Sequence, residues 1–419
     1  MKFHVVNLGC KVNRVESDSV AAGLLHSGHA LVESNADLVV VNTCTVTAEA
    51  DKKARKAVRH AISLNPNAKM VVTGCAAAIH PHAFEAIDDR ISVVPKFELE
   101  SYIAKLGSDW ESGSSQASNV CDADAPLRTG SDFNTRVSIK IQDGCNNSCT
   151  YCIVHVARGR ERSMPFEKVL SEVVSYARSG TREIVLTGIN IGSYSDGGRG
   201  LSSLLRSLLE ATKNLPDESY PVRFRISSIE PEDVDDELIE LISNAEGRIC
   251  RHLHLALQSG SSKVLLEMNR NYSAQDYIEL VDRICETIPE MSLSTDVIVG
   301  FPGETDEDFQ QTIDLATYCR FTKIHVFPYS RREGTPAAER VDQVPDNVKK
   351  DRASKLRKLS AALRESDFER RKGTTELALV EPDFAMTESY HEVELPFNAE
   401  NGQLIPVTIG DSVKLHARK

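Results

Sequence analysis

Three cysteines in the middle of the chain have the spacing of an iron–sulfur ligand set. Residues 143–152 read DGCNNSCTYC, which places Cys145, Cys149 and Cys152 in a Cys-x3-Cys-x2-Cys pattern. Three thiolates on a short polar loop can hold a 4Fe–4S cubane and leave one iron open to an outside ligand. A structural zinc loop is the alternative, but zinc sites favour paired Cys-x2-Cys units and four protein ligands. The pattern therefore predicts a catalytic 4Fe–4S cluster.

A second set of three cysteines is dispersed along the first hundred residues. Cys10, Cys44 and Cys75 each follow a Val-rich stretch that is typical of a buried strand. The carboxyl ends of neighbouring parallel strands share one edge of a sheet, where ligands are usually bound. Gly9 and Gly74 would allow the backbone to approach closely there. Buried cysteines acting as small hydrophobic residues are the alternative, but three equivalent positions favour one shared metal centre.

Length, charge and location set the context for these cysteines. The 419 residues predict two or three domains, and the net charge of −12 leaves room for only a local basic surface. The chain begins directly with a strand and has no membrane-spanning apolar run, so we expect a cytoplasmic protein with no membrane contact. In a reducing compartment its ten cysteines are candidates for metal ligands. Four show no joint spacing and are interpreted as filler: Cys121, Cys250, Cys285 and Cys319.

The elements that would position the cysteines follow an α/β pattern. In the first hundred residues, a parallel sheet is predicted from strands at 3–8, 38–42, 70–73 and 91–94 and helices at 48–63 and 82–88. After a Gly/Ser/Asp-rich linker, a second alternation of six β/α repeats begins at Arg136 and predicts a partial (β/α)6 barrel, with its chemistry at the carboxyl ends of the strands. Its further strands are predicted at 183–187, 222–227, 252–257, 293–299 and 323–327, and its helices at 167–178, 201–213, 235–243, 274–287 and 306–318.

The chain as a whole is therefore an α/β multidomain protein. The predicted parts are an N-terminal domain (1–106), a linker (107–134), the barrel (135–346), a charged helix (347–372) and a small all-β domain (373–419).

The loop cysteines and Tyr151 resemble the radical-SAM superfamily, in which the open iron binds S-adenosyl-L-methionine (SAM). With the dispersed triad, the chain resembles the methylthiotransferases over essentially its whole length. That resemblance implies an N-terminal cluster domain, a radical-SAM barrel, a C-terminal TRAM domain and two 4Fe–4S clusters. SAM contacts are implied at strand ends and in the loop: Tyr151, Thr187, Gly188, Ser228, Gln258 and Val299.

Short sequence motifs in the N-terminal domain indicate which substrate the enzyme would act on. The stretches LGCKVN (8–13) and NTCTVT (42–47) resemble bacterial enzymes that act on N6-threonylcarbamoyladenosine at tRNA position 37. The resemblance implies that a 5′-deoxyadenosyl radical abstracts hydrogen from adenosine C2, and that sulfur on the second cluster is methylated by another SAM and then transferred. The implied partners are tRNA, SAM, an electron donor and a sulfur donor.

Other functions stay open. The target could be isopentenyladenosine in tRNA or an aspartate of a ribosomal protein, and a metal-bearing RNA-binding protein without turnover is a rival from another class. An electron-transfer module is disfavoured, because both triads would leave an iron open. His155 and Met164 depart from the family, which usually has Pro and often Arg there. We expect His155 to be solvated or hydrogen-bonded rather than a ligand.

The tRNA contact is difficult to place from sequence. Residues 373–419 carry three basic residues against eight acidic ones, which is weak for a tRNA-binding domain. Two helices are rich in Lys and Arg, at 48–60 and 349–372, and either could contact phosphates. For each, a solvated helix with internal charge pairs is an equally good interpretation.

Overall fold

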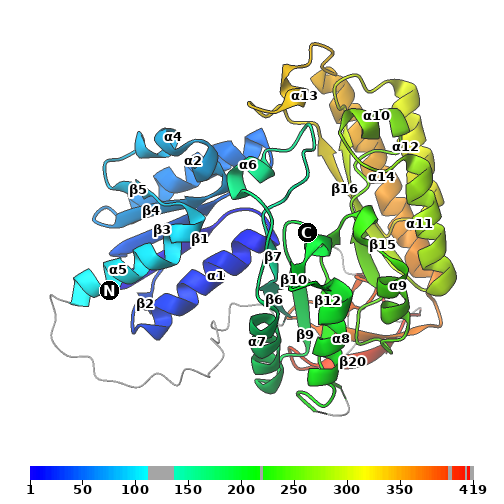
Figure 1. Cartoon of the computed structure of the whole chain (residues 1–419), viewed down its shortest axis with the longest axis horizontal. Coiled ribbons are helices and arrows are strands. Elements are labelled where there is room, and N and C mark those ends of the chain that lie inside the picture. The colour runs from blue at the N-terminus through cyan, green and yellow to red at the C-terminus, as the bar shows by residue number, and fades with distance from the viewer. Residues whose placement is uncertain (112–135, 218–219, 395–398, 411–412, 416–419) are drawn as a thin grey trace. The chain divides into compact units, whose positions relative to one another are not determined.

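The protein is described by a computed structural model that covers residues 1–111, 136–217, 220–394, 399–410 and 413–415 (Figure 1). Cys121 and most of the predicted linker lie outside these residues. The chain divides into two compact units. The first combines Met1–Asp132 with Gly144–Asn147 and Cys152–Arg160, and the second contains the rest, including Ser148–Tyr151.

The first unit is built on a five-stranded parallel sheet with the strand order β2-β1-β3-β4-β5. The strands are β1 (Lys2–Asn7), β2 (Ala30–Leu31), β3 (Leu38–Thr43), β4 (Lys69–Gly74) and β5 (Ile91–Val93). The helices are α1 (Lys11–His26), α2 (Ala48–Leu64), α3 (Cys75–Ile79), α4 (Pro81–Glu85) and α5 (Leu99–Glu111), with a 3-10 turn η1 (Lys96–Glu98).

Both faces of this sheet are covered because β3 is apolar on both sides. Val39 and Val41 pack with α2 and α4, while Leu38 and Val40 pack with α1 and α5. Figure 1 shows the two helix layers on opposite faces. All four predicted strands are present, whereas α1 was not predicted. Helix α5 continues to Glu111 and so extends into the segment predicted as a linker, because Leu99 and Ile103 anchor it on the sheet.

The second unit contains the predicted partial barrel of parallel strands. One sheet has the order β12-β9-β6, the other has the order β13-β14-β15-β16, and a parallel bridge from Phe224 to Ile249 lies beside β12. The strands are β6 (Arg136–Lys140), β9 (Glu183–Thr187), β12 (Arg223–Ile226), β13 (Ser228–Ile229), β14 (His252–Leu255), β15 (Ser292–Val299) and β16 (Lys323–Pro328). The helices packed on them are α7 (Phe166–Arg178), α8 (Leu201–Ala211), α9 (Asp236–Ser243), α11 (Ala274–Thr287), α12 (Asp306–Tyr318) and α14 (Asp346–Arg370).

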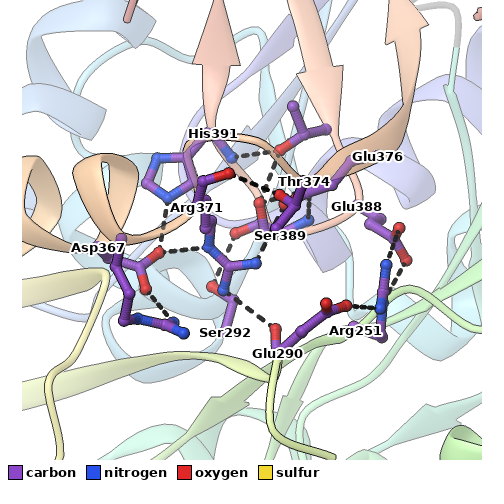
Figure 2. A network of polar contacts seen from close by, with 12 residues as sticks. Arg251, Glu290, Ser292, Asp367, Arg371, Thr374, Glu376, Glu388, Ser389 and His391 are labelled. Atoms are coloured by element: carbon purple, nitrogen blue, oxygen red, sulfur yellow. Dashed lines mark hydrogen bonds and ion pairs between the residues drawn. The ribbon is translucent and has the colours of Figure 1, made fainter. Parts of the chain in front are cut away.

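The C-terminal part is a small antiparallel sheet, as predicted. Its order is β19-β18-β17-β20, with β17 (Thr375–Val380), β18 (Ala385–Thr387), β19 (Glu392–Val393) and β20 (Leu404–Thr408). Figure 2 shows polar contacts that attach it to the amino ends of the barrel strands. Arg251, just before β14, pairs with Glu388 at 2.7 Å, and the Ser292 hydroxyl at the start of β15 donates to the Ser389 carbonyl at 2.7 Å.

A buried ion cluster lies at the same end of the barrel. Glu183 accepts hydrogen bonds from Arg223 (2.7 Å) and Arg225 (2.9 Å), and both guanidiniums also donate to carbonyl groups of the C-terminal sheet. Burial alone would raise the pKa of Glu183, but the charges of Arg225, Arg223 and Arg136 outweigh it and lower the pKa. The carboxylate therefore stays ionised and ties the sheet to the barrel.

These contacts explain the acidic composition of the C-terminal domain. Four of its acidic residues are buried: Glu376, Glu381, Glu388 and Glu392. The first three pair with arginines of α14, of β6 and of the segment before β14. Much of the acidic excess is thus internal, so the count of charges does not describe the surface of this domain. Among the described residues, no helix is both long and apolar enough to cross a bilayer.

Candidate functional site

The dispersed cysteines meet at the carboxyl edge of the N-terminal sheet. Cys10 caps the start of α1, Cys44 directly follows β3, and Cys75 is the first residue of α3, directly after β4. Cys44 and Cys75 are buried and Cys10 is exposed. Burial raises the pKa of the Cys44 thiol, and the nearby thiols of Cys10 and Cys75 raise it further. Three free thiols on one edge are a donor set that fits an iron–sulfur cluster with one iron left open.

Glycines make this convergence possible. Gly9 and Gly74 have φ angles of +112° and +98°, a region that favours glycine. A Cβ atom on Gly9 would lie 2.5 Å from the Cβ atom of Cys44, and one on Gly74 would lie 2.3 Å from the carbonyl oxygen of Thr43. The close backbone approach expected from sequence at these two positions is therefore present.

One buried amide connects the segments that carry the cysteines. The Nδ2 group of Asn13 donates to the carbonyls of Leu8 and Thr43, both at 2.9 Å, next to Cys10 and Cys44. Its Oδ1 atom accepts from Lys96 at 3.0 Å and from Arg158 at 2.6 Å. All of its hydrogen-bonding groups are therefore used. Sequence reasoning quoted Asn13 within a motif but assigned it no role.

A threonine and a short helix extend this network. The Thr43 hydroxyl donates to the Thr73 carbonyl at 2.6 Å and accepts from the amide of Ala77 at 3.0 Å, which links the Cys44 and Cys75 segments. Helix α6 (Val154–Arg158) packs on α3, and Arg158 pairs with Glu16 at 2.9 Å. The segment just after Cys152 is thus attached to the elements that present Cys10 and Cys75.

The loop cysteines are held by a different set of contacts. Gly144 has a φ of +75°, and a Cβ atom there would lie 2.1 Å from the Arg160 carbonyl oxygen. The amide of Cys145 donates to the Gly159 carbonyl at 3.2 Å. The sulfurs of Cys145 and Cys152 accept from the backbone amides two residues later, at 3.3 and 3.4 Å.

The centre of the loop, Ser148–Tyr151, is anchored by the turn after α10 (Ser262–Glu267). The amide of Thr150 donates to the Met268 carbonyl at 3.1 Å, and Asn269 donates to the Ser148 hydroxyl at 2.8 Å. Arg270 donates to the sulfur of Cys149 at 3.3 Å. Tyr151 packs beside Met268 in a small apolar cluster.

The cysteines that were interpreted as filler are packed into the second unit where the structure describes them. Cys319 belongs to the barrel core, Cys285 packs against that core, and Cys250 is buried just before β14. Burial raises the pKa of Cys250 to about 11 and that of Cys319 to about 12, and it also raises the pKa of Cys285.

The residues expected to contact SAM lie at the carboxyl ends of barrel strands or in the loop. Thr187 ends β9 and Gly188 follows it, while Ser228 lies two residues past the end of β12, where the short strand β13 begins. Gln258 has a φ of +66° and bridges to β15 beyond the end of β14. Val299 ends β15, but its side chain is fully buried in the core, so at most its backbone region can face a ligand. A residue that sequence reasoning missed is Gln142, whose Oε1 atom accepts from the amides of residues 189 and 190 at 3.0 and 2.9 Å.

A second group of possible metal donors lies on the inner strands. His254, Asp296 and His325 sit on β14, β15 and β16 with donor atoms within 4.8 Å of one another. His254 contacts the Ser294 hydroxyl at 2.9 Å through Nδ1 and Asp296 at 3.3 Å through Nε2. The signal in the sequence is alternation, because histidine, serine and aspartate occupy every second position of neighbouring strands.

The two departures from the family pattern have different surroundings. The Nδ1 atom of His155 is buried and has no hydrogen-bond partner among the described residues, while the side chain as a whole is half-buried, so its expected solvated or hydrogen-bonded state stays a prediction. Met164 packs against the barrel core, and its amide and carbonyl are both hydrogen-bonded.

The two basic helices differ in how their charges are used. On α14, many cations are paired within the protein, as Arg352 is with Glu304 and Asp306. On α2, within the described part of the chain, no cation has an acidic partner within 4 Å, and four are exposed: Lys52, Lys53, Lys56 and Arg59. The opposite face of α2 packs on the sheet through Ala54 and Val58. The interpretation as an internally paired helix therefore suits α14 but not α2.

Comparison with known proteins agrees with this arrangement. Residues 139–316 match the Radical SAM superfamily, and residues 2–95 match the Uncharacterized protein family UPF0004. A structure of the radical S-adenosylmethionine methyltransferase TsrM from Kitasatospora setae, with cobalamin and a 4Fe–4S cluster bound, superposes with a TM-score of 0.58 at 17% identity over 80% of this chain and 77% of that one. This likeness concerns the fold.

Sequence relatives carry the assignment further. Threonylcarbamoyladenosine tRNA methylthiotransferases MtaB are 37% identical in Thermotoga maritima (84% of this chain, 80% of the relative) and 35% identical in Aquifex aeolicus (98% and 100%). A tRNA-2-methylthio-N(6)-dimethylallyladenosine synthase from Acetivibrio thermocellus is also 37% identical (85% and 75%). Overall identity therefore does not separate the two nucleoside targets. The chain belongs to the radical-SAM tRNA methylthiotransferases, enzymes that use 4Fe–4S clusters and SAM.

Proposed function

We propose that this enzyme converts N6-threonylcarbamoyladenosine at tRNA position 37 to its 2-methylthio derivative. The proposal rests on the two sequence motifs LGCKVN and NTCTVT, which surround Cys10 and Cys44. The names of several similar relatives support it. A tRNA substrate places the enzyme in the cytoplasm, supplied by an electron donor and a sulfur donor.

We assign the two clusters to the two cysteine triads. Cys145, Cys149 and Cys152 hold the radical-SAM cluster, and Cys10, Cys44 and Cys75 hold the auxiliary cluster. When bound, the clusters supply the electron that cleaves SAM and the sulfur that is methylated. The domains are assigned as in the sequence, with residues 1–106 for the auxiliary site, 135–346 for the barrel and 373–419 for the TRAM-like domain.

The protein's own residues have two tasks around these sites. Thr187, Gly188, Ser228 and Gln258 orient SAM from the strand ends, and Tyr151 orients it from the loop. Val299 acts only through its backbone, since its side chain is buried. Asn13 and Thr43 hold the auxiliary cysteines at their mutual spacing through the hydrogen bonds described above.

We assign part of the tRNA contact to α2. Its exposed cations have no acidic partner within 4 Å among the residues that the structure describes, and they begin eight residues after Cys44, so they can contact phosphates without losing any of the described ion pairs. Replacing Lys52, Lys53, Lys56 and Arg59 by Gln should weaken tRNA binding and flatten its salt dependence, measured as the slope of log Kd against log salt concentration. As a control on the other basic helix, replacement of the exposed α14 residues Lys350, Lys355 and Lys358 by Gln should have a smaller effect; of these, Lys355 is paired with Asp351.

The decisive test is nucleoside mass spectrometry of tRNA from cells that lack this protein. Loss of 2-methylthio-N6-threonylcarbamoyladenosine, restored by the intact gene but not by a Cys75→Ala variant, is expected. Loss of the 2-methylthio-isopentenyl nucleoside instead would transfer the assignment to that target. Unchanged tRNA with a modified ribosomal aspartate would show a protein substrate, and no change in any product would favour an RNA-binding protein without turnover.

A further inference from the structure

A buried arginine contacts one of the loop cysteines. Arg270 lies beyond α10, 121 positions from Cys149 in the sequence, and its Nη1 group donates to the Cys149 sulfur at 3.3 Å. Arg270 is 7% exposed and Cys149 is also 7% exposed. The N–H···S contact is therefore screened from water on both sides.

Two other contacts fix the orientation of this guanidinium. Its Nη2 group is bound to the Glu230 carboxylate, and its Nε group donates to the Tyr272 hydroxyl at 3.2 Å. The Tyr272 hydroxyl in turn donates to the carbonyls of Ala256 and Leu257 at 2.7 and 3.0 Å, at the end of β14. The Arg270 side chain is thus held by barrel elements and has one nitrogen left to direct at the sulfur.

The charge of Arg270 persists in this setting, because a guanidinium is not deprotonated in proteins and the Glu230 carboxylate is bound beside it. The reduction potential of an iron–sulfur cluster depends on net charge, solvent exposure and hydrogen bonds to its sulfurs. A cation hydrogen-bonded to a ligand sulfur stabilises the more negative, reduced state, and more so in a site of low dielectric constant.

We propose that Arg270 is a positioning residue that raises the reduction potential of the loop cluster through its hydrogen bond to Cys149. The inference rests on the proposed function, because it takes Cys149 as a cluster ligand. The step concerned is uptake of one electron from an external low-potential donor. No bond forms or breaks in it, and the guanidinium keeps its protons. Glu230 orients Arg270 and limits the increase, since its negative charge opposes reduction.

The test is a potentiometric titration of the full chain reconstituted with both clusters, followed by electron paramagnetic resonance. The loop cluster is identified as the one whose signal changes when SAM is added. Arg270→Gln should reduce the ratio of reduced to oxidised loop cluster about tenfold at a fixed potential, equal to a fall of about 59 mV for one electron. Arg270→Lys keeps the positive charge but loses the planar array of N–H donors, so its reduction potential should fall less than that of Arg270→Gln.

Companion variants separate charge from packing. Glu230→Gln should leave the potential unchanged or raise it, and adding it to Arg270→Gln should recover part of the loss, because the pair is removed together. Arg223→Gln removes a buried arginine at the opposite ends of the strands, bonded to Glu183 and to carbonyl groups of the C-terminal sheet. It should lower the stability of the fold without moving the potential.

The outcomes distinguish this inference from the function itself. If Arg270→Gln and Arg270→Lys both had the reduction potential of the parent protein, the inference would be overturned. The proposed function would still stand if the same proteins formed the normal tRNA product. A lowered potential together with the wrong tRNA product would overturn only the substrate assignment. A parent protein without a SAM-responsive cluster would overturn both. If Arg270→Gln fails to hold its cluster, Arg270→Lys alone decides.

Discussion

The two cysteine sites use the same ligands but are supported differently. Cys10, Cys44 and Cys75 arrive at one sheet edge from three strands that are far apart in sequence. Cys145, Cys149 and Cys152 lie on one short loop, whose ends belong to the first compact unit and whose centre belongs to the second. The first site is therefore set by the fold of a sheet, and the second by local contacts of a loop.

This difference concerns preorganisation. Around the sheet site, backbone ladders and the side chains of Asn13 and Thr43 hold the segments that carry the cysteines, so we expect their spacing to persist when the metal is removed. Around the loop site, the backbone does not form a strand ladder, and donors to the cysteine sulfurs include two amides and the Arg270 guanidinium. A prepared site suits a cluster that must keep a sulfur in place, and an adjustable loop suits one that binds and releases SAM.

Replacing a cysteine of either site should have the largest effect on activity, and the two sites should lose different activities. Cys152→Ala should abolish both SAM cleavage and methylthiolated product, because it removes a ligand of the radical-SAM cluster. Cys75→Ala should lower the yield of methylthiolated product by at least about a thousandfold, as expected when a required group is lost. The same variant should still form 5′-deoxyadenosine. Iron content and both products are measured under anaerobic conditions. Cys250→Ala is the control, since this protonated core thiol belongs to neither site.

The glycines that precede the cysteines offer a second contrast. Gly74→Ala forces a left-handed φ on alanine and a clash with the rigid backbone of β3, so we expect a loss of roughly 2–5 kcal/mol in unfolding free energy and loss of the auxiliary cluster. Gly144→Ala clashes with a loop carbonyl instead, so it should cost less stability and affect only the loop cluster. Both are measured by denaturant unfolding and iron content.

A glycine in α1 provides the control. Gly23 has no heavy atom near the position of a Cβ and no positive φ, so Gly23→Ala should stabilise the protein by about 0.5–1 kcal/mol. Equal losses from Gly74→Ala and Gly144→Ala would mean that the sheet edge is as adaptable as the loop.

Asn13 allows a finer test of the sheet site. Asn13→Ala removes a hydrogen-bond partner from two carbonyls and from two cations, Lys96 and Arg158, which keep Glu16 as their ionic partner. We expect a loss of about 2–4 kcal/mol and a lower auxiliary iron content. Asn65 is the matched control, because it is an equally buried amide of the same unit, bonded near the amino end of β3. Asn65→Ala should destabilise the protein similarly but leave the iron content unchanged. Equal iron loss in both variants would reduce Asn13 to a purely structural role.

The pattern of what sequence could predict has a physical origin. Strands of the sheet and barrel were predicted because their apolar periodicity is not interrupted. Helix α1 was missed because two positions of its buried face hold Asn13 and Ser17, which bond to the edge that carries the cysteines. Function at that edge therefore removed the very signal that would have predicted the helix.

The cysteines themselves were visible in the sequence, but their partners were not. Spacing and strand ends predict the two triads, whereas Arg158 and Arg270 reach their partners across more than a hundred residues. The acidic C-terminal domain shows a related limit of sequence, because a charge count does not reveal that Glu376 and Glu388 are buried against arginines. Whether this domain contacts tRNA stays a prediction.

Removal of iron should give the smallest effect, a difference in hydrogen-exchange protection between the two cysteine sites. After chelation, hydrogen exchange followed by mass spectrometry should show loss of protection in the loop, where the amides of Cys145 and Thr150 donate to the carbonyls of Gly159 and Met268 outside any strand ladder. Peptides that contain Ala77 should change much less, because its amide remains bonded to the Thr43 hydroxyl inside the sheet network. Peptides of β14 serve as the internal reference. If both cysteine sites lost protection equally, the sheet edge would depend on its cluster for its structure. Preorganisation could then not explain why the two clusters are supported so differently.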